Sequence, residues 1–149
     1  MILFFDENLP PKVADGLRLL VEAMRSCSTL SPTSGERVKI LTAKGLKCRG
    51  KSDEELFEIL SKQREHVVFV TSDSNIQNDR VQRELFQRHG HSLLILRATK
   101  KNPWNACEVV YAFIKNWNKL IEYFLNNNPQ HYLRMLKTGI KEFDKDKKI

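Results

Sequence analysis

The sequence contains no apolar run near the roughly 18 residues that a membrane span requires. Its apolar start, Ile2 to Phe5, is only four residues long and is followed at once by acids. We therefore expect no transmembrane helix and no signal peptide. The three cysteines are widely spaced, and no two of them form a Cys-x-x-Cys pair. This scarcity argues against a disulfide framework or a zinc site and indicates a reducing compartment, so we expect a cytoplasmic protein.

Internal repeats and a second compositionally distinct region are also absent, so the 149 residues predict a single domain. A hydrophobic content of 41% and a charged content of 29% are ordinary for a globular protein. The chain carries 25 Lys and Arg against 18 Asp and Glu, a formal net charge of +7. Such an excess favours a polyanionic partner, although charge informs association rather than fold.

Two apolar segments end abruptly in acids and amides. Ile2 to Phe5 is followed by Asp6, Glu7 and Asn8, and His66 to Thr71 is followed by Ser72-Asp-Ser-Asn75. Short continuous apolar runs of this kind predict strands buried on both faces. In open α/β sheets, chemistry collects beyond the carboxyl ends of the strands. The polar residues after both segments are therefore candidates for one functional edge.

The remaining elements alternate between helices and strands. Apolar spacing predicts strands over 38–41 and 91–96, and helices over 10–24, 53–63, 79–88, 106–125 and 132–143, with an exposed loop over 25–36 and a mixed-charge tail over 141–149. Ser52 and Glu55 have the spacing of a capping box at the start of one helix. This order predicts an α/β fold with a mainly parallel sheet of about four strands, helices on both faces and a helical C-terminal extension over about 105–143.

Three carboxylates would converge at the carboxyl edge of this sheet: Asp6, Asp73 and Asp53 at the start of a helix. Two carboxylates about 4 Å apart repel by roughly 4 kcal/mol at an effective dielectric of 20, so their convergence needs compensation, usually by a cation or by a raised pKa. Hard oxygen ligands favour Mg²⁺ or Mn²⁺, and such a metal can activate water for phosphodiester hydrolysis. A purely structural alternative also exists, because acids at a helix start, such as Asp53 and Glu54, complement the helix dipole.

A loop dense in cations precedes the Asp53 helix. Lys44, Lys47, Arg49 and Lys51 could hold a phosphate backbone together with Arg97, which closes the strand over 91–96. The alternative for the loop is a solvated basic segment with no ligand.

The motifs Asp6-Glu-Asn-Leu-Pro10, Gly50-Lys-Ser-Asp-Glu-Glu55 and Val70-Thr-Ser-Asp73 resemble those of the DUF5615 group of PIN-like proteins. This group is related to the VapC-type toxin ribonucleases and to the Mut7-C domain. The resemblance covers about residues 1–97. It implies a PIN fold, a Mg²⁺- or Mn²⁺-dependent ribonuclease and often a toxin neutralised by an antitoxin, with Asp6, Asp53 and Asp73 at the acidic positions.

One acidic position of the family pattern is replaced here. The family commonly has a further acid two residues after the one matched by Asp73, and this chain has Asn75 there. Asp79 is a candidate substitute, although its alternative role is to begin the next helix. Glu7, Asn8 and Glu54 are secondary candidates. Glu7 and Glu54 are adjacent to the matched acids, and side-chain alternation would turn Glu7 away from Asp6. Because one charge is missing, a degenerate PIN-like module that binds RNA or a protein without cutting is the second hypothesis. A phospho-acceptor receiver domain is the third hypothesis. A homodimer is also a candidate assembly.

Overall fold

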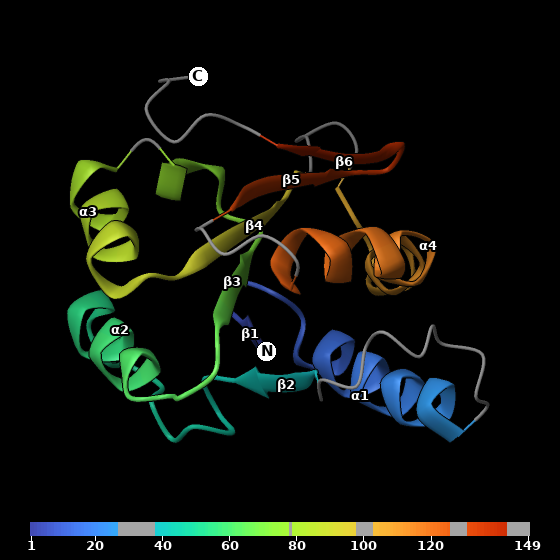
Figure 1. Cartoon of the computed structure of the whole chain (residues 1–149), viewed down its shortest axis with the longest axis horizontal. Coiled ribbons are helices and arrows are strands. Elements are labelled where there is room, and N and C mark those ends of the chain that lie inside the picture. The colour runs from blue at the N-terminus through green and yellow to red at the C-terminus, as the bar shows by residue number, and fades with distance from the viewer. Residues whose placement is uncertain (27–37, 78, 98–102, 126–130, 143–149) are drawn as a thin grey trace.

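The protein, described by a computed structural model over residues 1–26, 38–77, 79–97, 103–125 and 131–142, forms one twisted sheet with helices on both faces (Figure 1). Its strands are β1 (Ile2–Phe5), β2 (Lys39–Thr42), β3 (Val67–Thr71), β4 (Ser92–Leu96), β5 (Tyr132–Leu136) and β6 (Gly139–Glu142). The sheet order is β2-β1-β3-β4-β5-β6, and every neighbouring pair is parallel except β5 with β6. The predicted mainly parallel α/β fold is confirmed, with six strands instead of four.

Two helices cover each face of the sheet. The helices are α1 (Pro11–Ser26), α2 (Asp53–Ser61), α3 (Arg80–His89) and α4 (Ala106–Leu125), and a short 3₁₀ helix, η1, spans Ser74–Gln77. Figure 1 shows α1 and α4 on one side of the sheet and α2 and α3 on the other. These four helices match the predicted ones to within a few residues. Because parallel strands need such crossovers, β1 and β3 are buried on both faces.

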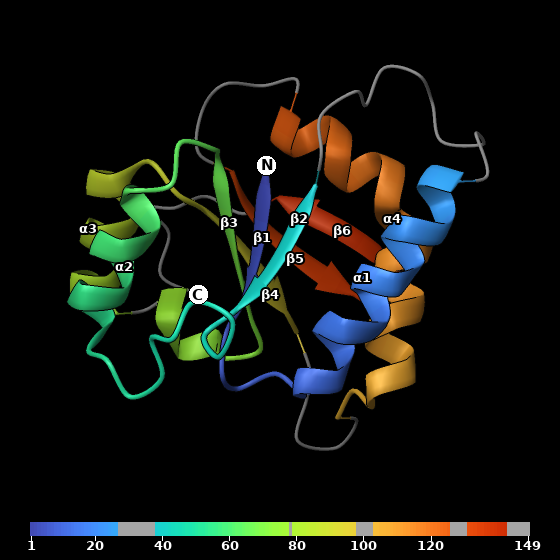
Figure 2. The ribbon, with the colours of Figure 1, turned by 90° about the horizontal axis from the view of Figure 1, so that it is seen from below.

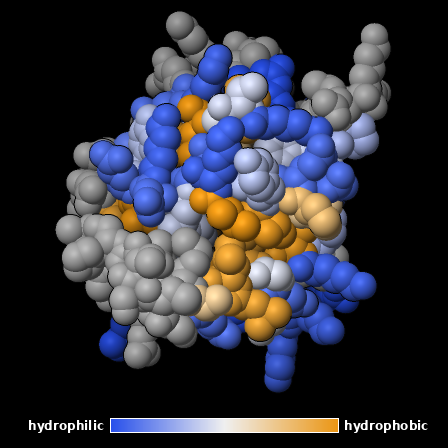
Figure 3. Space-filling view, turned by 90° about the vertical axis from the view of Figure 1, so that its right-hand side faces the viewer, coloured by the Kyte–Doolittle hydropathy of each residue, from blue (hydrophilic) through white to orange (hydrophobic). Residues whose placement is uncertain are grey.

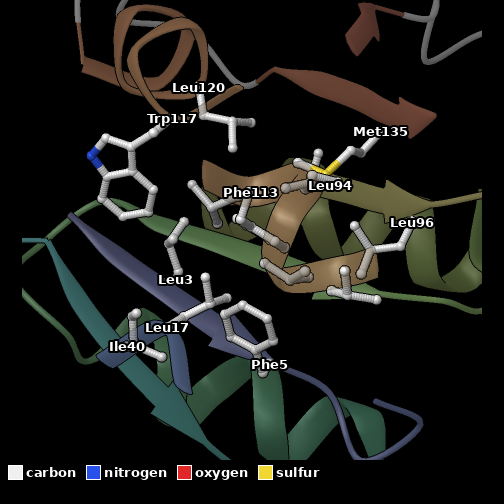
Figure 4. Close-up of a cluster of buried hydrophobic side chains, with 14 of the residues drawn as sticks. Leu3, Phe5, Leu17, Ile40, Leu94, Leu96, Phe113, Trp117, Leu120 and Met135 are labelled. Carbon is white, nitrogen blue, oxygen red and sulfur yellow. The ribbon is translucent and has the colours of Figure 1, made fainter. Parts of the chain in front are cut away.

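Successive side chains of β1 enter different cores. Leu3 and Phe5 pack in the cluster beneath α1 and α4, where Figure 4 shows them beside Phe113. Ile2 and Phe4 pack in the second cluster, with residues from α2 and α3. The run ends at the first residue that cannot be buried in an apolar core, Asp6. The sequence pattern thus sets the position of the polar edge.

The helix ends follow the predicted capping chemistry. The Ser52 hydroxyl accepts a hydrogen bond from the Glu55 N–H, and the Glu55 carboxylate accepts one from the Ser52 N–H, so the capping box is confirmed. Asp79 is the N-cap of α3, since its Oδ1 accepts from the N–H groups of Val81 and Gln82 at 2.8 and 3.2 Å. Asp79 therefore has the predicted helix-starting role, and a role for it as a replacement acid stays a prediction.

The predicted helix over 132–143 is wrong. Residues Tyr132–Leu136 and Gly139–Glu142 form the hairpin β5–β6, and β5 extends the parallel sheet beside β4. Apolar residues in a short run satisfy helical and extended spacing equally well, and Gly139 is the turn-forming residue next to the turn at Lys137-Thr138. Gly139 has a φ of +150°, which lies in the region that favours glycine.

The outer surface of α1 and α4 carries an apolar groove of about 360 Å³, visible as the hydrophobic patch in Figure 3. Val13, Val110 and Ile114 are among its lining residues. No helix in the described part of the chain is long and apolar enough to cross a membrane. The predicted loop over 25–36 and the tail over 141–149 lie almost entirely outside the described residues.

Candidate functional site

The site begins where β1 and β3 end side by side (Figure 2). Phe5 lies opposite Val70 in the parallel register, so the next residues, Asp6 and Thr71, face each other across the two strands. The backbone N–H of Asp6 donates to the Val70 carbonyl at 3.0 Å, which carries the ladder one residue past β1. Asp6 is consequently held by the sheet, not by a free loop.

Three donors orient the Asp6 carboxylate. Its Oδ1 accepts from the Glu7 N–H at 2.7 Å, and its Oδ2 accepts from Asn8 Nδ2 at 2.8 Å and from Thr71 Oγ1 at 2.9 Å. A carboxylate offers about four acceptor positions, so roughly one remains for a further ligand. The side chain is half-buried and keeps one fixed direction at the edge of the sheet.

Thr71 connects Asp6 to Asp73. While its hydroxyl donates to Asp6, the same oxygen accepts from the Asp73 N–H at 3.0 Å. Asp73 Oδ1 in turn accepts from the Asn75 N–H at 2.8 Å, at the start of η1. Thr71 is fully buried, so this bridge is shielded from water. Thr71 thus links the Asp6 carboxylate to the Asp73 backbone at the same edge of the sheet.

Asp53 belongs to a different hydrogen-bond group. It is exposed in the first turn of α2, and its Oδ2 accepts from Gln82 Nε2 of α3 at 2.8 Å. The described residues contain no group of three or more His, Cys, Asp or Glu side chains that could hold a metal ion. One ion held jointly by Asp6, Asp53 and Asp73 is therefore not visible as a preformed cluster, and the role of Asp53 stays a prediction.

A pocket of about 360 Å³ lies next to Asp6, between the end of β1, the first turns of α1 and the β2–α2 loop. Glu7 lines this pocket together with Asp6, although strand alternation had predicted that the two would diverge. The chain leaves the extended conformation at Glu7, so alternation no longer applies. Asp15 and Arg18 of α1 also line the pocket, and the sequence had not indicated either residue.

Of the predicted RNA-binding cations, Lys44 and Arg49 line the pocket. Lys51 forms an exposed ion pair with Glu55 at 3.3 Å, and Arg97 lies at the end of β4, where its carbonyl accepts from the Trp104 indole at 2.9 Å. Lys47 adopts a positive φ of +54° in the loop turn. Of the four loop cations, Lys44 and Arg49 therefore line the pocket beside Asp6, and Lys47 and Lys51 do not.

The remaining secondary candidates are exposed polar groups. Asn8 donates to Asp6, Glu54 lies in the first turn of α2, and Asn75 contributes its backbone N–H to Asp73. Beneath the cationic loop, burial raises the pKa of the Cys48 thiol, which makes it less ready to form a thiolate at neutral pH.

A family model described as PIN like domain matches residues 1–98. The chain belongs to the PIN-like domain family. The match contains β1 to β4 and the whole Asp6–Thr71–Asp73 network. The searches of curated proteins and of solved structures gave no match. PIN-like domains are often nucleases and typically use divalent metals.

The carboxyl edge of this PIN-like domain suits a cation held by few protein ligands. Mg²⁺ usually keeps several waters and takes only one or two carboxylates from a protein. Asp6 keeps about one free acceptor position, and Asp73 keeps the oxygen not used by Asn75, so each carboxylate could supply one ligand to such an ion. Asp53 Oδ2 accepts from Gln82, so Asp53 keeps its other oxygen for a ligand.

The sequence alone missed Thr71 and Gln82 as members of the site. The register could have indicated Thr71, because pairing the last apolar residue of each run, Phe5 with Val70, places Thr71 opposite Asp6. Gln82 had no such signal, since its contact with Asp53 depends on the packing of α2 against α3.

Proposed function

We propose that this PIN-like protein is a metal-dependent endoribonuclease that hydrolyses RNA phosphodiester bonds at the carboxyl edge of its sheet. The hydrogen bond from Thr71 to Asp6 is the observation that carries the proposal, because it fixes a carboxylate beside the Asp73 segment without neutralising it. The adjoining pocket contains Lys44 and Arg49, which suit a polyanionic substrate.

In this proposal Asp6 and Asp73 hold Mg²⁺ or Mn²⁺, and Asp53 adds negative charge from the start of α2. When bound, such a cation lowers the pKa of a water ligand and stabilises the leaving oxygen. Thr71 positions Asp6, and Lys44 and Arg49 bind the phosphate backbone. Lys47, Lys51 and Arg97 would contact RNA farther from the cleaved bond.

The resemblance to the DUF5615, Mut7-C and VapC-type proteins supports a biological role as the toxin of a toxin–antitoxin pair. This role includes a cytoplasmic location and an antitoxin protein as partner, with a homodimer as a possible assembly state. Co-expression with the product of a neighbouring gene would test it, and suppression of both growth arrest and RNA cleavage is the expected result.

The nuclease proposal is tested by incubating mixed RNAs with Mg²⁺ or Mn²⁺. We expect Asp6→Asn and Asp73→Asn to lower the cleavage rate by at least about 100-fold, because loss of a group that only orients a metal ligand already costs about 10- to 100-fold. Glu84→Gln is a matched control, because Glu84 is exposed on α3 and pairs only with Arg80 among the interactions described. Equal cleavage by wild type and Asp6→Asn would contradict the proposal.

A non-catalytic PIN-like module that binds RNA or a protein is the second candidate. Two observations favour it: Asn75 replaces an expected acid, and the described residues contain no preformed three-acid cluster. Binding of a ligand to the folded state alone raises its stability. If Mn²⁺ leaves the melting temperature unchanged and RNA is bound but uncut, this candidate replaces the nuclease.

A further inference from the structure

We propose that the pocket beside Asp6 is a subsite for one unpaired nucleotide of the substrate, with Arg18 as its principal phosphate contact. The inference rests on the proposed nuclease function and adds the recognition of the nucleotide next to the cleaved bond. It assigns a binding role to Arg18, a helix residue outside the cationic loop.

The pocket has the size of a small-ligand site. Its volume of about 360 Å³ lies near the lower end of the range of about 300–1,000 Å³ for such sites. Three separate segments line it: the end of β1, the start of α1 and the loop after β2. A space of this size is suited to one nucleotide-sized group rather than to a base pair.

Arg18 is held in place before any ligand arrives. Its Nη1 donates to Asp15 Oδ1 at 2.9 Å, and its Nη2 donates to the Ile40 carbonyl at 3.2 Å. These bonds use two of the five guanidinium donors, and the side chain is 45% exposed. A guanidinium fixed in this way can bind a phosphate oxygen with little further loss of side-chain entropy.

The loop opposite Arg18 is folded by its own backbone. The N–H groups of Leu46 and Cys48 donate to the carbonyls of Thr42 and Ala43, each at 3.0 Å. The Gly45 N–H donates to Thr42 Oγ1 at 3.1 Å. This turn places the exposed side chains of Lys44 and Arg49 at the pocket, where they provide the second and third cations.

Part of the lining is apolar. Phe5, Leu9 and Ala14 are buried residues that reach the pocket, and Pro10 adds an exposed apolar surface. Apolar lining with a few placed polar groups is typical of pockets that take a ring-bearing ligand. The sugar and base of a nucleotide would pack against this lining while its phosphate faces the cations.

The formal charges of the pocket cancel. Asp6, Glu7 and Asp15 balance Arg18, Lys44 and Arg49. Without a metal, a phosphate is therefore attracted by one part of the pocket and repelled by another. Removing the charge of Asp6 should strengthen nucleotide binding even though it removes the proposed catalytic carboxylate. Nucleotide affinity and cleavage should thus respond in opposite directions to one substitution.

The test is calorimetric titration of adenosine 5′-monophosphate and, separately, inorganic phosphate into the whole protein in the presence of EDTA. We expect Arg18→Ala and Arg49→Ala each to weaken nucleotide binding about tenfold, as for a lost charge-assisted contact. We expect Asp6→Asn to tighten it about threefold or more, the scale of one unit charge in a solvent-accessible pocket. Lys62→Ala is the control, because Lys62 is an exposed cation on the far end of α2 that pairs with Glu58.

Unchanged nucleotide affinity in both arginine variants would overturn the subsite, as would phosphate binding as tightly as the nucleotide. Arg49→Ala keeps the test valid if Arg18→Ala lowers the melting temperature, because Arg49 is exposed in the loop. The proposed function is judged by a different readout. Full cleavage by Asp6→Asn would reject the nuclease role, whereas the affinity pattern alone decides the subsite.

Discussion

The Thr71 hydroxyl donates a hydrogen bond of 2.9 Å to Asp6 although the two residues lie 65 positions apart in the chain. The parallel register of β1 and β3 brings them face to face, and the burial of Thr71 protects the bond from water. This contact joins the two strand ends into one polar edge. It also makes Thr71 the positioning residue for both Asp6 and Asp73.

Thr71→Val tests this role because it preserves the shape of the side chain and removes the hydroxyl. We expect a loss of about 1–3 kcal/mol in the free energy of unfolding, since the Asp73 N–H loses its acceptor in a partly buried position. The rate of RNA cleavage should fall as well. Urea unfolding and an RNA cleavage assay measure the two effects. Thr71→Ser should restore cleavage, and equal cleavage by the Val and Ser variants would contradict a positioning role.

Much of the sheet could be predicted because β1, β3 and β4 are short apolar runs that end in polar residues. The capping residues Ser52 and Asp79 likewise carry local signals that do not depend on tertiary contacts. The hairpin β5–β6 could not be predicted from its spacing, since its strand character comes from pairing with β4. Arg18 was missed for a similar reason: its role depends on a pocket built by three distant segments.

We expect Asp79 to contribute to stability and not to cleavage. Its carboxylate caps α3 through two backbone N–H groups, so Asp79→Ala should lower the free energy of unfolding by about 1 kcal/mol. Because Asp79 lies outside the Asp6–Thr71–Asp73 network, the cleavage rate of the folded protein should stay within about twofold of wild type. Thermal unfolding and cleavage at a temperature well below the melting transition measure both. A large loss of cleavage in a fully folded Asp79→Ala protein would instead assign it to the site.

Two substitutions distinguish the charge of Asp53 from its hydrogen bond to Gln82. Asp53→Asn keeps an oxygen that can accept from Gln82 Nε2, whereas Gln82→Met keeps the Asp53 charge and removes the donor. We expect Gln82→Met to cost about 1 kcal/mol of stability, the typical value of one hydrogen bond. We expect Asp53→Asn to lower cleavage, but less than Asp6→Asn does. A loss as large as that of Asp6→Asn would show that Asp53 is an equal partner in the proposed metal site.

His91 makes the stability of the fold sensitive to acid. The side chain is only 4% exposed and stacks on Phe57, and burial lowers its pKa from 6.5 to about 4. The unfolded chain therefore binds a proton between these values while the folded chain does not. The contribution of neutral His91 to the free energy of unfolding is fully present above about pH 6.5. It is lost as the pH falls toward 4, by at most about 3 kcal/mol.

Urea unfolding between pH 7 and pH 4 measures this slope, and His91→Asn should reduce it. Asparagine can still donate to the Phe57 backbone but does not titrate, so the variant should lose less free energy of unfolding on acidification than wild type does. We also expect the variant to be less stable than wild type at pH 7. Part of the slope should remain, because burial also lowers the pKa of His66. Glu65 and Glu108 have lowered pKa values, so they change the stability only near the pH range in which they titrate. This effect is the same in wild type and in His91→Asn. An unchanged slope in His91→Asn would show that His91 does not remain neutral in the folded protein.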